Sequence, residues 1–174
     1  NPITLVTLVF IPELKGYWEE SLDVLKVCLN SVFENTRIPY DLLVFDNGSC
    51  AEVRDYLLDL QDKGKIQYLL LAHDNVAKIG CFNLAFPGSP GDYIAFFDSD
   101  VYFYQGWLGA TLKVFEAFDN VGMVTARPGR DPVDGTKYLS STFAFADRAE
   151  NGLVVERGEL IPNDVLSEHF VGTG

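Results

Sequence analysis

Two aspartates separated by one serine follow an apolar run that is typical of a buried strand. The run, Tyr93 to Phe97, leads directly into Asp98, Ser99 and Asp100. It predicts a short strand, buried on both faces, that carries both carboxylates to the sheet edge where open α/β folds bind ligands. Carboxylate oxygens suit Mg²⁺ or Mn²⁺, metals that usually bind together with phosphate. The residues therefore favour a metal–diphosphate site.

Each candidate site residue also has a simpler structural interpretation. The segment from Asp98 to Asp100 would equally suit a solvated turn. Asp46 could accept a hydrogen bond from a base or a ribose, but the sequence from Asp46 to Ser49 also suits a turn and a helix N-cap. Lys78 could contact a diphosphate, or it could be an exposed residue at the start of a helix. Spacing alone leaves these alternatives open.

The pattern of apolar residues alternates between strand and helix. Ser49 and Glu52 have the spacing of a capping box, and Gly64 suits a left-handed helix end. This alternation predicts right-handed crossovers and a mostly parallel sheet, with Asp46, Asp98 and Asp100 facing one cleft. We expect strands at 3–11, 40–45, 66–71, 93–97 and 121–126, helices at 19–35, 49–63, 79–86 and 105–119, and then strands at 138–146 and 153–157 as an antiparallel excursion.

Composition restricts the class of partner. The chain has 174 residues, enough for one domain with a full core, and a formal net charge of −12. That charge argues against nucleic acid or an anionic membrane surface as the main partner. No apolar stretch approaches the roughly 20 residues of a spanning helix, so we expect no transmembrane segment. The three cysteines, Cys28, Cys50 and Cys81, lack metal-ligand spacing and predict reduced thiols in a cytoplasmic protein.

The loop after the first strand argues against two neighbouring classes of protein. It runs from Phe10 to Gly16 and lacks the glycine pattern that lets a backbone approach a pyrophosphate. A dinucleotide-binding fold is therefore disfavoured. Nucleotidyl transfer on a similar scaffold is also disfavoured, because this segment is not the Gly/Arg/Lys-rich loop that sugar-nucleotide pyrophosphorylases use there.

Several motifs occur together in a recognisable order. They are a strand ending in Pro12, then 28–32 (CLNSV), 45–49 (FDNGS), Asn75 and Asn83 eight residues apart, 91–100 (GDYIAFFDSD) and 106–108 (GWL). Over roughly residues 3 to 126 this order resembles family 2 glycosyltransferases of the GT-A fold. The resemblance implies a Rossmann-like three-layer α/β sandwich with a mostly parallel central sheet and a short antiparallel excursion after residue 127.

The resemblance also implies roles for individual residues. Pro12 would line the nucleoside pocket and Asp46 would bind the base. Asp98, with Ser99 beside it, would contact the ribose. Asp100 would ligate a Mn²⁺ or Mg²⁺ ion that bridges the donor diphosphate, with Asp98 as its neighbour at the metal. The partners implied are a UDP- or GDP-sugar and an acceptor of unknown identity, and the reaction implied is sugar transfer with inversion.

The sequence departs from the family pattern at several positions. Ala77 and Phe82 stand where family members often have Gly and Arg, and Lys78 is a candidate to replace the missing positive charge. The family's Glu-Asp motif for the catalytic base is not evident, which leaves Asp164 and Glu168 as candidates. We therefore interpret residues 1–126 as a nucleotide-sugar-binding half and residues 127–174 as a partial acceptor-side region. A catalytically incomplete binding or assembly module of the same fold is the alternative to an enzyme.

Overall fold

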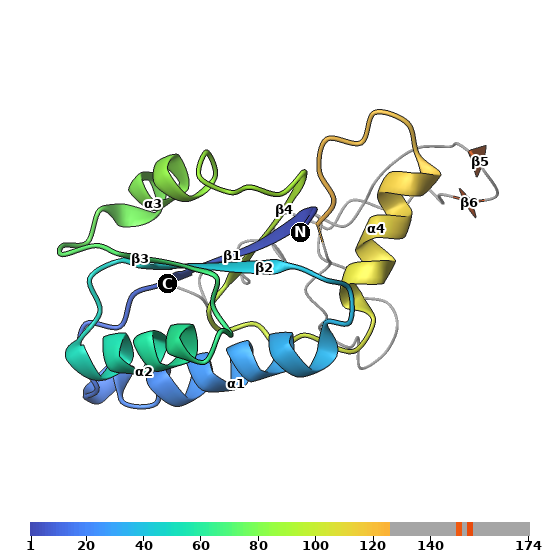
Figure 1. Cartoon of the computed structure of the whole chain (residues 1–174). Helices are drawn as coiled ribbons and strands as arrows, with labels where there is room; N and C mark the ends of the chain where they lie inside the picture. Colours follow the sequence, from blue (N-terminus) through green and yellow to red (C-terminus); the bar gives the residue numbers. More distant parts are fainter. Residues whose placement is uncertain (126–148, 151–152, 155–174) are drawn as a thin grey trace, which may run out of the picture. The chain divides into compact units, whose positions relative to one another are not determined.

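The structure is a computed structural model that describes residues 1–125, 149–150 and 153–154. The chain forms two compact units, Asn1–Ala110 and Thr111–Gly174. The first unit contains a parallel sheet with helices on both faces (Figure 1). This confirms the predicted α/β class. The division predicted between residues 126 and 127 stays a prediction.

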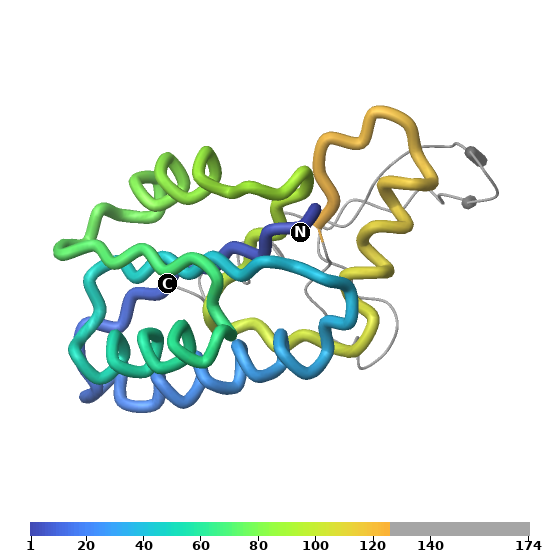
Figure 2. The backbone as a smooth tube through the Cα atoms, in the orientation of Figure 1, coloured from blue at the N-terminus to red at the C-terminus, as the bar shows by residue number. Residues whose placement is uncertain are grey.

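The sheet contains four strands in the order β3-β2-β1-β4, and all neighbours are parallel. Each strand is followed by a helical crossover before the next strand begins, as the continuous trace in Figure 2 shows. In the part of the chain that the structure describes, β4 pairs only with β1 and is an edge strand. The strands are β1 (Ile3–Val9), β2 (Asp41–Asp46), β3 (Tyr68–Leu71) and β4 (Tyr93–Asp98).

The helices cover the two faces of this sheet unequally. Helices α1 (Ser21–Asn35) and α2 (Ala51–Asp62) lie on one face, and the shorter α3 (Ala77–Ala85) lies on the other (Figure 1). A 3-10 turn, η1 (Gly16–Trp18), precedes α1, and α4 (Trp107–Ala117) follows β4. The three layers therefore match the predicted sandwich.

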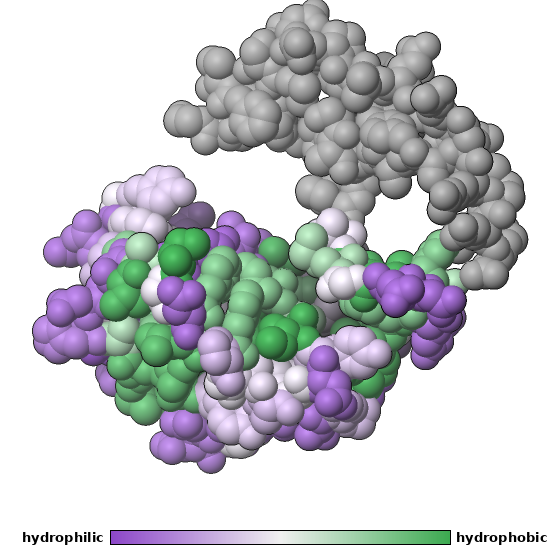
Figure 3. Space-filling view, turned by 90° about the horizontal axis from the view of Figure 1, so that it is seen from above, coloured by the Kyte–Doolittle hydropathy of each residue, from purple (hydrophilic) through white to green (hydrophobic). Residues whose placement is uncertain are grey.

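The two faces of the sheet form two parts of the core. On the α3 face, Val6, Leu43 and Phe45 pack with Cys81 and Ala85 of the helix. The opposite face is buried under α1 and α2, which contribute Leu25, Leu29, Val32, Val53 and Leu57, each 1% exposed or less. The α3 face of the sheet is covered less completely. Figure 3 shows apolar side chains at the surface on this side, where Ile79 and Leu84 are 68% and 58% exposed.

Three local predictions were wrong. Cys50, not Ser49, is the N-cap of α2, because the Ser49 hydroxyl instead accepts a hydrogen bond from Ile11 N at 3.0 Å. Residues 121–125 of the strand predicted at 121–126 are not a strand, and residue 126 lies outside the described residues. The expected burial of β4 on both faces fails because it lies at the described sheet edge, where Tyr93 and Ile94 are 43% and 42% exposed.

The second unit is described only in part. Its strands β5 (Ala149–Glu150) and β6 (Leu153–Val154) pair antiparallel. The strand predicted at 138–146 and most of the one at 153–157 lie outside the described residues, so the antiparallel excursion stays a prediction. Among the helices of the described ranges, none has both the length and the apolar character needed to cross a membrane.

Candidate functional site

The register of the sheet determines where the two strand-ending carboxylates point. Leu8 of β1 pairs with Asp98, and the next residue, Val9, pairs with Asp46. Both aspartates thus lie at the carboxyl edge, on either side of β1. Successive residues of a strand point to opposite faces, so this offset of one residue sends the two side chains to opposite faces. The expectation that Asp46 and Asp98 face one cleft was wrong.

Asp46 is fully buried against α2. Its Oδ2 lies 3.0 Å from Arg54 Nε, and its Oδ1 accepts a hydrogen bond from Ser49 N at 3.1 Å. The same guanidinium donates through Nη2 to the carbonyl of Ala72, just after β3. The Asp46–Arg54 pair therefore ties the ends of β2 and β3 to α2. Its contact with a base stays a prediction, and it would require one of these partners to move.

Asn47 joins the turn after β2 to the loop before α3. Its Nδ2 donates to Asn75 Oδ1 and its Oδ1 accepts from Val76 N, both at 2.8 Å. Gly48 has a φ of +89°, and a Cβ built there would lie 3.2 Å from Asn75 N. Only glycine avoids both the strain and the crowding. The link positions the start of α3, from which Lys78 projects.

Lys78 and Asp98 form the polar centre of the α3 side. Lys78 Nζ lies 2.7 Å from Asp98 Oδ1, and both side chains are about half exposed, at 49% and 59%. The ammonium also lies 5.1 Å from the ring centroid of Phe96 and 5.9 Å from that of Phe82. Cation–π contacts of this kind hold a lysine head group without neutralising it. The structure thus brings together two predicted donor-binding residues from α3 and β4.

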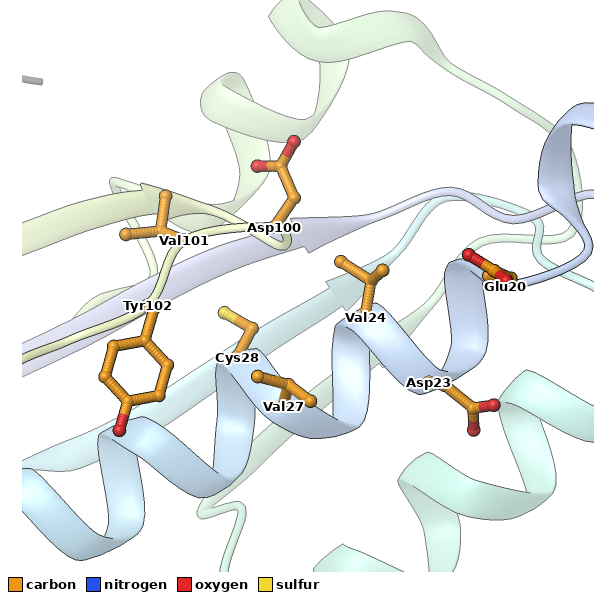
Figure 4. Close-up of a pocket in the computed structure, with 8 residues that line it drawn as sticks. All are labelled: Glu20, Asp23, Val24, Val27, Cys28, Asp100, Val101 and Tyr102. Atoms are coloured by element: carbon orange, nitrogen blue, oxygen red, sulfur yellow. The ribbon is translucent and has the colours of Figure 1, made fainter. Parts of the chain in front are cut away.

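Asp100 stands in the loop after β4, at the rim of a groove along α1 (Figure 4). Beneath this loop lies Cys28, whose Sγ is 3.8 Å from the carbonyl oxygen of Asp98. Burial raises the pKa of the Cys28 thiol to about 11, and the negative charge of Asp100 adds to this effect. Cys28 is therefore a neutral packing residue at pH 7, and all three cysteines are free thiols.

The other predicted site residues have simpler surroundings. Pro12 is exposed in the loop after β1, and Ser99 is partly buried between the two aspartates. The candidate bases Asp164 and Glu168 lie outside the described residues. In the part of the chain that the structure describes, no group of three or more His, Cys, Asp or Glu side chains could hold a metal ion.

Sequence reasoning missed Arg54 and the Asn47–Asn75 link. Arg54 stands eight residues after Asp46, one turn into the helix that follows the strand. An arginine in that position is a recognisable partner for a strand-ending carboxylate. The Asn47–Asn75 contact joins residues 28 apart, and no local pattern predicts it.

Comparisons with known proteins identify the family. The sequence profile of Glycosyl transferase family 2 matches residues 17–167, most of the chain. An uncharacterised glycosyltransferase of Nostoc sp. strain PCC 7120 is 28% identical over 96 residues, which are 55% of this chain and 30% of that protein.

Solved structures show the same fold. The crystal structure of S. aureus TarS 1–349 has a TM-score of 0.53 at 16% identity and covers 67% of this chain and 32% of its own. The same fragment in complex with UDP has a TM-score of 0.53 at 15% identity, covering 72% of this chain and 38% of its own. The chain spans about a third of the length of these relatives. With the profile match and the GT-A arrangement of sheet and helices, the chain belongs to glycosyl transferase family 2.

Proposed function

We propose that this chain binds a nucleotide-diphosphate sugar and forms part of an enzyme that transfers the sugar to an acceptor hydroxyl. The observation that carries the proposal is the Lys78–Asp98 pair, which lies beside Asp100 at the carboxyl end of β4. The family profile matches residues 17–167, which include all three residues. Structures of S. aureus TarS contain UDP-GlcNAc and UDP, which supports a uridine diphosphate donor. A GDP-sugar is the alternative donor.

The carboxylates of Asp100 and Asp98 fit a Mn²⁺ or Mg²⁺ ion. Both residues are exposed and offer hard oxygen ligands. Mg²⁺ is commonly held by one or two carboxylates, with phosphate oxygens and water as its other ligands. The small number of protein ligands in the described part of the chain suits this mode. When bound, such a metal would neutralise charge that grows on the leaving diphosphate.

Lys78 would supply positive charge on the α3 side of the diphosphate. In the described structure its ammonium is engaged by Asp98. If Asp98 turns to a metal or a ribose, the ammonium is free to donate to phosphate oxygens. Because the negative charge of the nucleoside diphosphate increases as the glycosidic bond breaks, Lys78 would stabilise the transition state more than the ground state. Pro12 and Ser99 would contribute contacts to the nucleoside.

Inversion and the catalytic base are further parts of the proposal. A carboxylate that deprotonates the acceptor hydroxyl would permit in-line attack on the anomeric carbon from the side opposite the diphosphate. Asp164 and Glu168 remain the candidates for this base. The three free thiols suit a reducing compartment, which supports a cytoplasmic location as part of the proposal.

The test measures donor binding and turnover separately. Titration calorimetry with UDP and Mn²⁺ should give saturable binding, and incubation with UDP-GlcNAc or a GDP-sugar should release the nucleoside diphosphate. Asp100→Asn removes one carboxylate charge at the proposed metal position and should abolish the Mn²⁺ dependence of UDP binding. The control is Asp92→Asn, an exposed aspartate just before the amino end of the same strand. Both variants should keep their stability within about 0.5 kcal/mol.

The results distinguish the enzyme from its alternative. Binding without release of a nucleoside diphosphate from any donor would support the catalytically incomplete module. Equal Mn²⁺-dependent affinity in the wild type and in Asp100→Asn would remove Asp100 from the metal site. No binding of any nucleoside diphosphate would contradict the proposed function as a whole.

A further inference from the structure

A groove of about 360 Å³ runs between the first turns of α1 and the loop after β4. Figure 4 shows Val24 and Val27 on the helix and Val101 and Tyr102 on the loop. Val27 and Tyr102 are 55% and 53% exposed. The volume lies within the range of small-molecule sites, roughly 300–1,000 Å³. The groove lies on the α1 face, apart from the Lys78–Asp98 pair on the α3 face.

The loop wall of the groove is fixed to α1 by specific contacts. Phe103, next to Tyr102, donates its N–H to Ser31 Oγ at 3.0 Å, and its carbonyl accepts from Asn35 Nδ2 at 2.8 Å. The Phe103 ring packs edge-on against Phe97 of β4, with centroids 4.9 Å apart. The position of Tyr102 relative to α1 is therefore set by both neighbouring elements.

The groove combines apolar walls with carboxylates. Glu20, Asp23 and Asp100 line it together with the three valines, Cys28 and Tyr102. Lys26 offsets part of this charge, because its Nζ lies 2.8 Å from Asp23 Oδ1. Carboxylates accept hydrogen bonds from hydroxyl groups, and a tyrosine ring packs against apolar C–H surface. A sugar ring presents both, whereas an anionic ligand would be repelled.

Asp100 links this groove to the proposed donor site. It stands at the rim, and its carboxylate points away from Cys28 (Figure 4). An acceptor held in the groove would therefore reach Asp100 from the α1 face, the side opposite the Lys78–Asp98 pair and the proposed diphosphate. We propose that the groove binds the acceptor, and that the acceptor is an uncharged saccharide whose ring packs on Tyr102. This inference rests on the proposed function, because it presumes a donor at Asp100.

The experiment follows UDP release from UDP-GlcNAc and Mn²⁺ with graded concentrations of methyl glucosides, methyl galactosides and neutral disaccharides. At least one of these saccharides should stimulate release above the rate with water. Tyr102→Ala and Val27→Ser should each raise the KM for that saccharide at least tenfold, with a smaller change in kcat. Both side chains are about half exposed, so both variants should fold. The matched control is Tyr68→Ala, which removes a 41% exposed tyrosine from β3.

Several results would overturn the inference. If the KM for the stimulating saccharide stays within twofold of the wild-type value in both groove variants, the inference is wrong and the proposed function stands. Stimulation only by basic peptides, or only by lipid vesicles, would assign the groove's acceptor to another class. If UDP neither binds nor is released, the proposed function fails. An NMR titration of the full chain with the same saccharides then decides whether the groove binds them, with Tyr102→Ala as the comparison and no binding as the contrary result.

Discussion

The Nζ atom of Lys78 lies 2.7 Å from Asp98 Oδ1, so two residues predicted to bind one donor bind each other in the described structure. The pair joins α3 to the end of β4 on the face opposite Asp46. Exposed ion pairs contribute little to stability, so this contact can exchange for a ligand at small cost. We therefore regard it as the resting arrangement of the proposed donor site.

Lys78→Ala should weaken the binding of UDP with Mn²⁺ by about 1.5–3 kcal/mol, the range for hydrogen bonds to charged groups. The loss should shrink at high salt, because the side chain is half exposed. Titration calorimetry at two salt concentrations measures both effects. Lys63→Ala is the control, since Lys63 forms an exposed pair with Asp59 at 2.6 Å on α2. A change below about 0.3 kcal/mol at low salt, far under the expected range, would make Lys78 a solvated surface residue.

Arg54→Ala should destabilise the fold by about 3–5 kcal/mol, because it leaves the buried Asp46 carboxylate without its charged partner. Urea unfolding measures this loss. Arg54→Ala combined with Asp46→Asn should recover part of it, because the second change removes the unpaired charge and keeps an acceptor for Ser49 N. A loss near that of Lys63→Ala, expected within about 0.5 kcal/mol, would contradict a structural role for the Arg54–Asp46 pair.

Ala77→Gly should stabilise the protein by about 1 kcal/mol. Ala77 has a φ of +59°, a left-handed conformation that costs a residue with a Cβ about 1–2 kcal/mol. The greater freedom of glycine in the unfolded chain offsets part of this gain. Ala51→Gly, at the first residue of α2, is the comparison and should destabilise, since Ala51 is not among the positive-φ residues. Thermal unfolding of both variants tests the difference, and a lower stability for Ala77→Gly would contradict the strain.

The free energy of unfolding should decrease as the pH rises from about 9 to about 11, because folding raises the pKa of the Cys28 thiol from 9.0 to about 11. Between these pH values the folded thiol keeps its proton, whereas the unfolded thiol has lost it. The stability that the neutral thiol contributes is therefore fully present below pH 9 and is lost as the pH rises through about 11. Urea unfolding at several pH values should show a shallower decrease for Cys28→Ala. A slope remains in that variant because burial also raises the pKa of Tyr56, to about 12. Identical slopes would show that Cys28 does not titrate in this way.

The sequence by itself determined the order of the strands and α-helices from β1 to α4, and with it the strands that carry the candidate site. The apolar run from Tyr93 to Phe97 predicted β4 and placed Asp98 at its end, and the Gly64 stop of α2 has the expected positive φ, +69°. The motif order from Pro12 to Trp107 was enough to indicate the family. These features depend on local periodicity and turn chemistry, which neighbouring residues encode.

Only the tertiary structure decided which way the carboxylates face. Side chains alternate between the two faces of a strand, so the face that a residue occupies depends on the register between strands that are distant in sequence. Asp98 pairs with Leu8 and Asp46 with the next residue, Val9. This offset of one residue places the two aspartates on opposite faces. Burial of Asp46 against Arg54 and the seating of Phe103 on α1 likewise arise from packing between elements. The hydrogen bond from Phe103 N to Ser31 Oγ holds the loop wall of the groove against α1, and it joins residues 72 positions apart, beyond the reach of any local pattern.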